Sequence, residues 1–214
     1  MSLADKIFFQ NCNEIIKSGI NDNDYPVRPH WQDGTPAHTY KKFALVNRYD
    51  LSVEFPILTC RKIAWKLALD EIFWIWQKKS NKVSELKSKI WDQWVGKDGT
   101  IGKAYGYQLG LKAKYPDGCF DQVDRVLKDL KETPWSRRIL TNLYNIADLH
   151  AMNLYPCAYS LTLNVTQGKL NGILNQRSND VAVANNWNVV QYSLLLHMFA
   201  QVSNLKVGEL VHVI

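Results

Sequence analysis

The chain has 214 residues, of which 46% are hydrophobic and 21% charged, and its formal net charge at pH 7 is +6. This composition is typical of one packed globular domain over residues 1–214; it excludes a disordered chain, and no apolar stretch reaches the roughly 18 to 20 residues that span a bilayer. The basic residues are scattered, so the charge suits a small anionic ligand as well as a nucleic acid, and RNA binding is not indicated.

The amino-terminal half predicts two helices separated by a loop. Residues 3–18 carry apolar side chains at helical spacing and stop at Gly19, whereas residues 21–37 are rich in Asp, Asn, Gly and Pro, as in a loop. Residues 62–76 are apolar on nearly every face, which predicts a helix buried on several sides. Glu71 lies in that helix. Its carboxyl must be paired, raised in pKa or open to a cleft, because uncompensated burial of a charge is costly.

The carboxy-terminal half predicts a sheet with further helices. Helices are expected at about 121–131 and 189–203, and strands from 138, at 159–165, at 170–176 and from near 207. Polar and apolar residues alternate on both sides of the turn Gln167-Gly168-Lys169, which predicts a hairpin with one buried face. Because strands and helices do not strictly alternate, we expect an α+β fold: a single domain with a twisted mixed β-sheet covered by helices.

Cys157 is the candidate nucleophile among four cysteines. No pair of cysteines has the Cys-x-x-Cys spacing of a zinc or redox site, so we expect neither a metal nor a disulfide framework, and the absence of a signal peptide favours a reducing cytoplasm. Taken alone, Cys157 fits a small buried side chain better than a nucleophile. However, Pro156 fixes the backbone before it, and Arg177 is close enough in sequence to return beside it across the turn, where a guanidinium stabilises the thiolate.

Arg137 and Arg138 are candidate ligands for an anion. In an extended segment two adjacent side chains point to opposite faces, so at most one of them joins a given anion site within its own subunit. A phosphate accepts several such guanidinium forks. The five histidines show no metal-ligand spacing, and His197, in an apolar helix, is expected to be a hydrogen-bonded core histidine.

As a set, the motifs resemble those of the thymidylate synthase family. Pro156-Cys157 is followed by Gln176-Arg177-Ser178-Asn179-Asp180 and by Asn188. The other matching segments, collinear over almost the whole chain, are 58–59, 70–74, 90–94, 105–108, 136–138 and 208–211. The segment 31–39 is similar to a divergent bacterial or bacteriophage branch. The resemblance implies a thymidylate-synthase-like fold in a homodimer that packs sheet to sheet.

The resemblance implies the reductive methylation of deoxyuridine monophosphate (dUMP) to dTMP, with 5,10-methylenetetrahydrofolate as co-substrate and no metal. Cys157 would add to C6 of the uracil, and Glu71 would manage protons through water near O4. Tyr105 would position water for removal of the C5 proton. Trp91 and Trp94 would line the folate side and exclude water there.

The resemblance also implies how the substrates are held within one subunit. Arg177 and Ser178 would bind the phosphate, and Gln176 lies in the same substrate-binding strand motif. Asp180 and Asn188 would orient the pyrimidine and the folate ring. Asn188 is therefore both a substrate-binding and a catalytic candidate.

Three further arginines extend this expectation to a second subunit. By resemblance, Arg137 and Arg138 reach the phosphate of the partner subunit, which makes the homodimer obligate. Arg28 is a further candidate for the same phosphate, although the loop around it differs from that of the family.

The chain also departs from the family. Residues 183–188 read Val-Ala-Asn-Asn-Trp-Asn where the family has Leu-Gly-x-Pro-Phe-Asn, Ala158 replaces a common His, and the sequence ends at Ile214, before the family's carboxy-terminal segment. Two alternatives therefore stay open. One is a hydroxymethylase acting on dUMP or dCMP, against which Trp91 argues. The other is a catalytically inactive nucleotide- or RNA-binding homologue.

Overall fold

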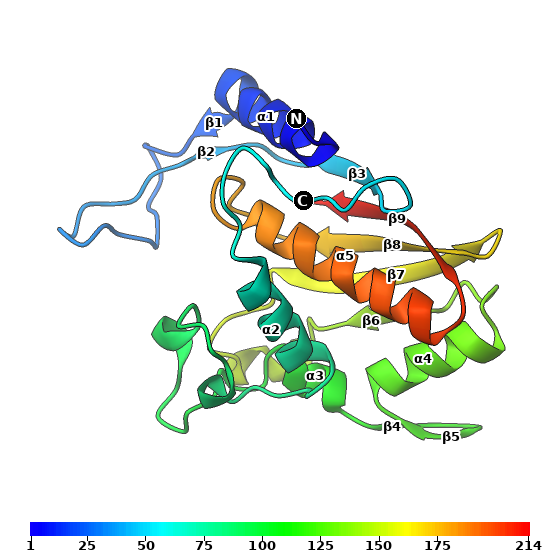
Figure 1. The fold of residues 1–214 in the computed structure, drawn as a ribbon. Coiled ribbons are helices and arrows are strands. Elements are labelled where there is room, and N and C mark those ends of the chain that lie inside the picture. Colours follow the sequence, from blue (N-terminus) through cyan, green and yellow to red (C-terminus); the bar gives the residue numbers. More distant parts are fainter.

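A five-stranded mixed sheet forms the centre of the computed structural model, which describes all residues 1–214 (Figure 1). The strands, in the order in which they lie side by side, are β3 (Val46–Asp50), β9 (Lys206–Val213), β8 (Lys169–Gln176), β7 (Ala158–Thr166) and β6 (Leu140–Asn142). β8 and β9 are parallel, whereas the other neighbouring pairs are antiparallel. The predicted α+β fold with a mixed sheet is confirmed.

The predicted hairpin is formed by β7 and β8. Leu161 lies opposite Leu174, and both side chains are buried. Gln167 and Gly168 connect the strands with φ values of 51° and 74°, the left-handed conformation that lets a two-residue turn follow the twist of the strands. A register shift at the start of β7 interrupts the alternation, so Tyr159, expected on the buried face, is only partly buried.

The two faces of the sheet differ, as two neighbouring rows across the strands show. One row is buried throughout and consists of Thr141, Leu161, Leu174, His212 and Asn47. The next row, displaced by one residue along each strand, points to the opposite face and consists of Leu140, Thr162, Ile173, Val211 and Arg48. On that face the side chains of Leu140 and Ile173 are 51% and 41% exposed.

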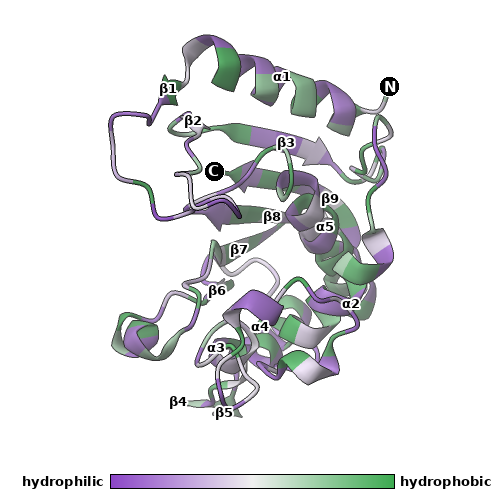
Figure 2. Cartoon of the chain, turned by 90° about the vertical axis from the view of Figure 1, so that its left-hand side faces the viewer, coloured by the Kyte–Doolittle hydropathy of each residue, from purple (hydrophilic) through white to green (hydrophobic).

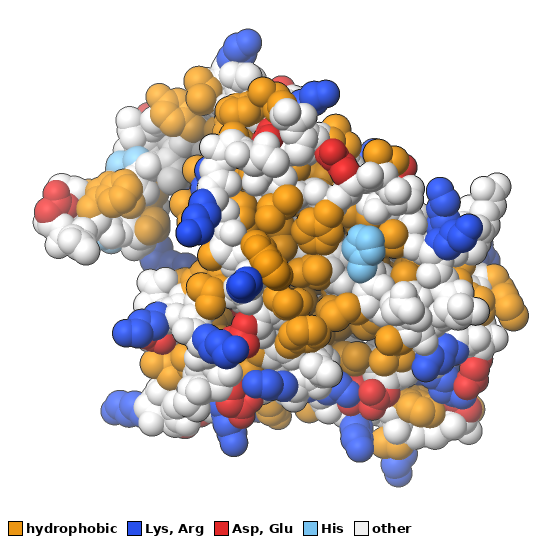
Figure 3. Space-filling model, viewed as in Figure 1, with side chains coloured by type: hydrophobic (Ala, Val, Ile, Leu, Met, Phe, Trp, Pro, Cys, Tyr) orange, Lys and Arg blue, Asp and Glu red, His pale blue; other side chains and the backbone are white.

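Helices cover the buried face (Figure 2). α5 (Asn185–Val202) lies across β8 and β9, and α2 (Trp65–Trp76) packs on α5. The core lies between these helices and the sheet, with Trp74, Ile72 and Leu174 fully buried. Figure 3 shows apolar side chains gathered over α2 and α5, with Lys, Arg, Asp and Glu around them.

Two of the remaining helices, α1 and α4, begin where the sequence supplies a side-chain cap. α1 (Leu3–Ser18) opens with a capping box in which Ser2 and Asp5 each accept a hydrogen bond from the other's backbone, and it ends at Gly19 as predicted. α4 (Gln122–Glu132) opens with Asp121, whose carboxylate accepts from two backbone amides. α3 (Gly106–Gly110) is a single short turn next to α2 and α4.

The smaller elements had no clear signal in the sequence. They are the pairs β1 (Ile20–Asn21) with β2 (Tyr40–Lys41) and β4 (Ala113–Tyr115) with β5 (Gly118–Phe120), and the 3-10 turns Val83–Glu85, Asp92–Trp94 and Ile146–Ala151. The pair β1–β2 closes the base of the loop that contains Arg28. No helix of the protein is long and apolar enough to cross a membrane.

The expectation that His197 is a hydrogen-bonded core histidine is wrong. Its imidazole is only partly buried, lies 6.0 Å from the ring of Phe55 and makes no hydrogen bond. The buried histidine is His212 on β9, which is fully shielded from solvent and contacts Gln176. An apolar helix also has an outer side, and His197 lies there.

Candidate active site

Cys157 lies at the start of β7, and Arg177 returns beside it at the end of β8. The backbone N–H of Arg177 donates to the Cys157 carbonyl at 3.0 Å, and a terminal guanidinium nitrogen, Nη2, is 3.8 Å from Sγ. Nε and Nη2 also donate to the carbonyls of Pro156 and Tyr155, at 3.0 and 2.8 Å. The predicted pairing of thiol and guanidinium across the hairpin is confirmed. Nη1 has no partner in the chain and is free for an anion.

Tyr105 approaches Cys157 from the other side. Its hydroxyl oxygen accepts a hydrogen bond from the Cys157 N–H at 3.0 Å. Burial, and then the negative charge of an ionised Cys157, hold the pKa of Tyr105 well above its ordinary value. The hydroxyl therefore stays protonated, and its O–H can donate a hydrogen bond to a bound water. Its backbone has φ 48°, an unusual conformation for a residue other than glycine.

The next residue explains how this conformation is held. Gly106 lies so close to Ser80 that a Cβ at position 106 would be 2.2 Å from the Ser80 carbonyl oxygen. Only glycine allows this approach, which fixes the backbone immediately after Tyr105.

Glu71 is buried in α2 with 6% of its surface exposed. Loss of hydration raises the pKa of Glu71 to about 7, although nearby Gln191, Trp187 and Trp91 act in the opposite direction. The indole N–H of Trp187 donates to Oε2 at 3.0 Å. The raised pKa expected for a carboxyl in this apolar helix is confirmed, and it allows Glu71 to gain or lose a proton near neutral pH.

A chain of hydrogen bonds fixes the carboxamide of Asn188, in the first turn of α5. Burial lowers the pKa of His212 to about 4, so its ring is neutral near pH 7 and Nε2 donates to Oε1 of Gln176. Nε2 of Gln176 donates to Oδ1 of Asn188 at 3.2 Å, Nδ2 of Asn188 donates to Gln191 at 3.1 Å, and Gln191 donates to the carbonyl of Ala68 at 3.4 Å. One N–H and one lone pair of Asn188 remain free.

Ser178 and Asp180 lie in the exposed segment between β8 and α5. The hydroxyl of Ser178 has no partner in the chain. Asp180 shapes this segment, because its carboxylate accepts from the Val183 N–H at 3.0 Å and its carbonyl accepts from the N–H groups of Ala184 and Asn185. Asp180 thus positions the residues that lead into α5 and Asn188.

The three remaining arginines stand apart from this cluster. The guanidinium groups of Arg28, Arg137 and Arg138 are exposed and form no hydrogen bond or ion pair within the chain. The expectation that Arg137 and Arg138 lie in an extended segment is wrong: they occupy a turn before β6, stabilised by a hydrogen bond from the Arg138 N–H to Oγ of Ser136 at 3.2 Å. The alternation of a strand therefore does not separate their side chains.

Trp91 and Trp94 form an aromatic group with Tyr105. The ring of Trp91 lies 5.2 Å from that of Tyr105 and 5.6 Å from that of Trp94. Trp91 is 6% exposed and Trp94 only partly buried, so Trp94 provides most of the accessible surface. The indole N–H of Trp91 is buried and has no hydrogen-bond partner.

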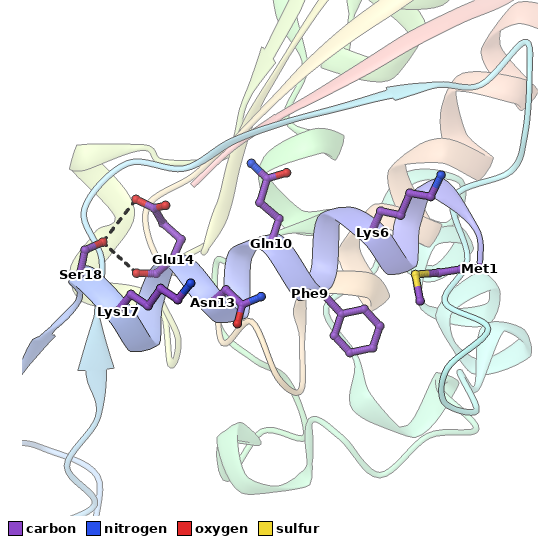
Figure 4. Close-up of a pocket in the computed structure, with 8 residues that line it drawn as sticks. All are labelled: Met1, Lys6, Phe9, Gln10, Asn13, Glu14, Lys17 and Ser18. Atoms are coloured by element: carbon purple, nitrogen blue, oxygen red, sulfur yellow. Dashed lines mark hydrogen bonds between the residues drawn. The ribbon is translucent and has the colours of Figure 1, made fainter.

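The chain contains neither a metal centre nor an enclosed pocket around α1 that involves the candidate residues. No group of three or more His, Cys, Asp or Glu side chains is arranged to hold a metal ion. An open hollow of about 770 Å³ runs along α1 (Figure 4), but it is lined mainly by polar side chains and contains none of the candidate site residues. The chemistry lies at the hairpin instead.

The sequence analysis missed three residues that the fold brings to the site. Trp187 was noted only as a change in the loop, and Gln191 and His212 were not expected there at all. The sequence did carry a signal for Gln191, because it is a polar residue inside the apolar helix α5. The structure buries it, with 1% of its surface exposed. Nothing in the local sequence links His212 to Gln176.

These groups bring together a cysteine thiol, a fixed guanidinium beside it and a buried carboxyl with a pKa of about 7. Such a set is typical of the class of enzymes that act through a cysteine nucleophile. The family profile described as thymidylate synthase matches residues 6–214. The thymidylate synthase of Bacillus phage phi3T is 49% identical over 214 residues, which cover 98% of this chain and 76% of the phage protein. Thymidylate synthase 1 of Bacillus subtilis strain 168 is 47% identical with the same coverage.

The structures agree with the sequences. The thermostable thymidylate synthase A from Bacillus subtilis superposes on this fold with a TM-score of 0.95 and 45% identity, covering 100% of this chain and 78% of that one. The chain belongs to the thymidylate synthase family and is a methyltransferase. The relatives named here are all thymidylate synthases, which supports methylation over the hydroxymethylase and inactive alternatives.

Proposed function

We propose that this enzyme converts dUMP to dTMP with 5,10-methylenetetrahydrofolate, and that it works as an obligate homodimer. The observation that carries the proposal is the position of the Cys157 thiol, 3.8 Å from a guanidinium nitrogen of Arg177 whose other contacts hold it in place. The guanidinium is therefore placed to interact with the sulfur atom that attacks the substrate.

The thiolate of Cys157 adds to C6 of the uracil. The C5–C6 electron pair then moves toward C4 and O4, which turns C5 into a carbon nucleophile. Glu71 exchanges a proton with O4 through water, a task that suits a carboxyl with a pKa of about 7. The hydroxyl of Tyr105 accepts from the Cys157 N–H and donates to the water that removes the C5 proton.

The residues present fit a flat co-substrate next to this site. Trp94 offers aromatic surface for a pteridine ring, and the buried indole N–H of Trp91 lacks a partner that a polar ligand atom or water could supply. When bound, the folate supplies the carbon and the hydride. The protein's part is to orient it and, through Trp91 and Trp94, to exclude water.

Asn188 reads the base in this proposal. Its free lone pair accepts from N3–H of uracil and its free N–H donates to O4. The chain from His212 through Gln176 supports this role, because it prevents the carboxamide from rotating by 180° and presenting the reversed pattern.

The phosphate would be bound by residues from two subunits. Arg177 offers Nη1 and Ser178 an unpaired hydroxyl from one subunit, and the exposed, unpaired Arg137 and Arg138 would come from the partner. The second, partly exposed face of the sheet supports a dimer packed sheet to sheet, since the apolar residues Leu140 and Ile173 are open there. Arg28, in its exposed loop, is a further candidate for the same phosphate.

A mechanism-based nucleotide tests the proposal. Incubation with 5-fluoro-dUMP and methylenetetrahydrofolate should leave a covalent adduct on the peptide that contains Cys157, and incubation with dUMP should yield dTMP by mass spectrometry. Cys119→Ala, a change at an exposed cysteine, should retain both results, whereas Cys157→Ala should lose both with its fold intact. An adduct on another peptide, or a hydroxymethylated product, would contradict the proposal.

A further inference from the structure

Trp187 differs from the residue that the family has at this position, and it directly precedes Asn188, the residue proposed to read the base. It occupies the first turn of α5, directly before Asn188, where the family resemblance predicts Phe. Both residues are aromatic, but only the indole carries an N–H donor. In this structure the donor points at Glu71, 116 residues away in the sequence.

Trp187 donates a hydrogen bond to the Glu71 carboxyl. Oε2 accepts it at 3.0 Å, whereas Gln191 and Trp91 lie near the carboxyl without a well-formed hydrogen bond to it. Gln191 lies near the carboxyl, but its amide is engaged with Asn188 and with the carbonyl of Ala68. Ala158, which stands where the family commonly has a His after the nucleophile, offers no side-chain donor at all.

We propose that Trp187 is a positioning residue that holds Oε2 of Glu71 as an acceptor and thereby leaves Oε1 as the oxygen that exchanges the proton during methylation. The reason is that an indole N–H only donates, so it bonds best to an oxygen that carries no proton of its own. The proton therefore binds to Oε1. Because Asn188 is the next residue along α5, the same helical turn orients both the base and the proton-carrying oxygen.

The electrostatic surroundings of Glu71 make nearby hydrogen-bond donors important for its protonation, and Trp187 is one of three, with Gln191 and Trp91. Desolvation by the surrounding helices opposes the carboxylate. Three other titratable groups lie near the Glu71 carboxyl, and each is either negatively charged or neutral: Asp70 on α2, Tyr105 before α3 and Tyr192 on α5. No Lys or Arg is paired with the carboxyl, so hydrogen-bond donors such as Trp187 are what favours the charged form.

Infrared titration of the ligand-free protein tests this inference without turnover. The absorption of the protonated Glu71 carboxyl is assigned as the band that is missing in Glu71→Gln. In Trp187→Phe the midpoint of that band should move to higher pH by at least about one unit, because the carboxylate loses a donor. Trp65→Phe, a change of a 44% exposed Trp on the same helix as Glu71, should leave the midpoint unchanged.

A second variant controls for the possibility that water fills the space left by the smaller Phe ring and replaces the lost donor. Benzothienylalanine at position 187 replaces the indole N–H by sulfur and keeps the bicyclic ring, so it should give the same upward shift with the fold intact. An unchanged or lowered midpoint in this variant would overturn the inference. The role assigned to Trp187 rests on the proposed methylation. The two can fail separately, because the titration can give an unchanged midpoint while the covalent adduct on Cys157 still forms.

Discussion

Burial sets the chemistry of two titratable side chains at this site, and it acts on them in opposite directions. The same loss of hydration raises the pKa of Glu71 to about 7 and lowers that of His212 to about 4. The sign differs because the acid is charged when deprotonated and the imidazole is charged when protonated. As a result His212 stays a fixed neutral donor near pH 7, whereas Glu71 can exchange a proton.

Glu71→Gln should make the protein more stable, and the gain should depend on pH. Between the unfolded pKa of 4.5 and the folded pKa of about 7, the folded state binds more protons at Glu71 than the unfolded state, so the stability that this residue contributes is lost as pH rises. The free-energy difference between variant and parent should grow by about 3 kcal/mol from about pH 4.5 to about pH 8. Urea unfolding across this range measures it; a constant difference would contradict the raised pKa.

Asn188→Asp should shift the base preference from dUMP toward dCMP. Cytosine presents an acceptor at N3 and a donor at N4, the reverse of uracil, and a carboxyl can accept from N4 and, when protonated, donate to N3. We expect the ratio of kcat/KM values for the two nucleotides to change by at least about tenfold. Asn13→Asp, at an exposed position of α1, is the matched control. An unchanged ratio would show that Asn188 does not read the base.

At the scale of elements, the site depends on where short segments meet. Cys157 directly precedes β7, Arg177 follows β8, Tyr105 precedes α3, and Asn188 lies in the first turn of α5. Each of these four residues thus lies at an end of an element, where its backbone is held by a rigid neighbour.

Gly106→Ala should displace Tyr105 by disturbing the junction of α3 with the segment after α2. The added Cβ would lie 2.2 Å from the backbone oxygen of Ser80, which cannot rotate away. We expect a loss of about 1–3 kcal/mol in the free energy of unfolding and a fall in kcat. Gly110→Ala in the same helix meets only a side-chain carbon of Lys79 at 3.3 Å and should cost less. Equal effects of both changes would refute this account.

At the scale of the whole molecule, the main question is how two chains combine. The sheet has one face covered by α2 and α5 and another with exposed apolar residues, and the guanidinium groups of Arg137 and Arg138 are unpaired within the chain. Both features are explained if a second copy covers the open face and receives these arginines.

Mixing two inactive variants should therefore restore activity. One chain carries Arg137→Ala and Arg138→Ala, the other Cys157→Ala. In their heterodimer, one of the two sites has an intact thiol and receives intact arginines from the partner. Each heterodimer should have about half the activity of a wild-type dimer, so random exchange of equal amounts should restore about a quarter of the wild-type activity, as measured by dTMP formation. No recovery after exchange has been verified would argue against shared sites.

Much of this protein follows from short stretches of sequence. The period of apolar residues and the caps at Ser2 and Asp121 define α1 and α4, because helix boundaries depend on local hydrogen bonds. The hairpin turn at Gln167-Gly168 is local as well, and it alone brings Arg177 back to Cys157. The cytoplasmic location remains a prediction from the sequence.

Only the tertiary structure decided the rest of the site. β3 reads Val-Asn-Arg-Tyr-Asp, so no apolar alternation marks it as a strand, and it is defined only by its pairing with β9. His212 meets Gln176, and Trp187 meets Glu71, across 36 and 116 residues of sequence. The sequence by itself determined that Arg177 lies beside Cys157, since one hairpin places both residues. The tertiary structure determined which side chains hold Glu71 and Asn188, because packing α2 and α5 against each other and the sheet creates contacts that no local period encodes.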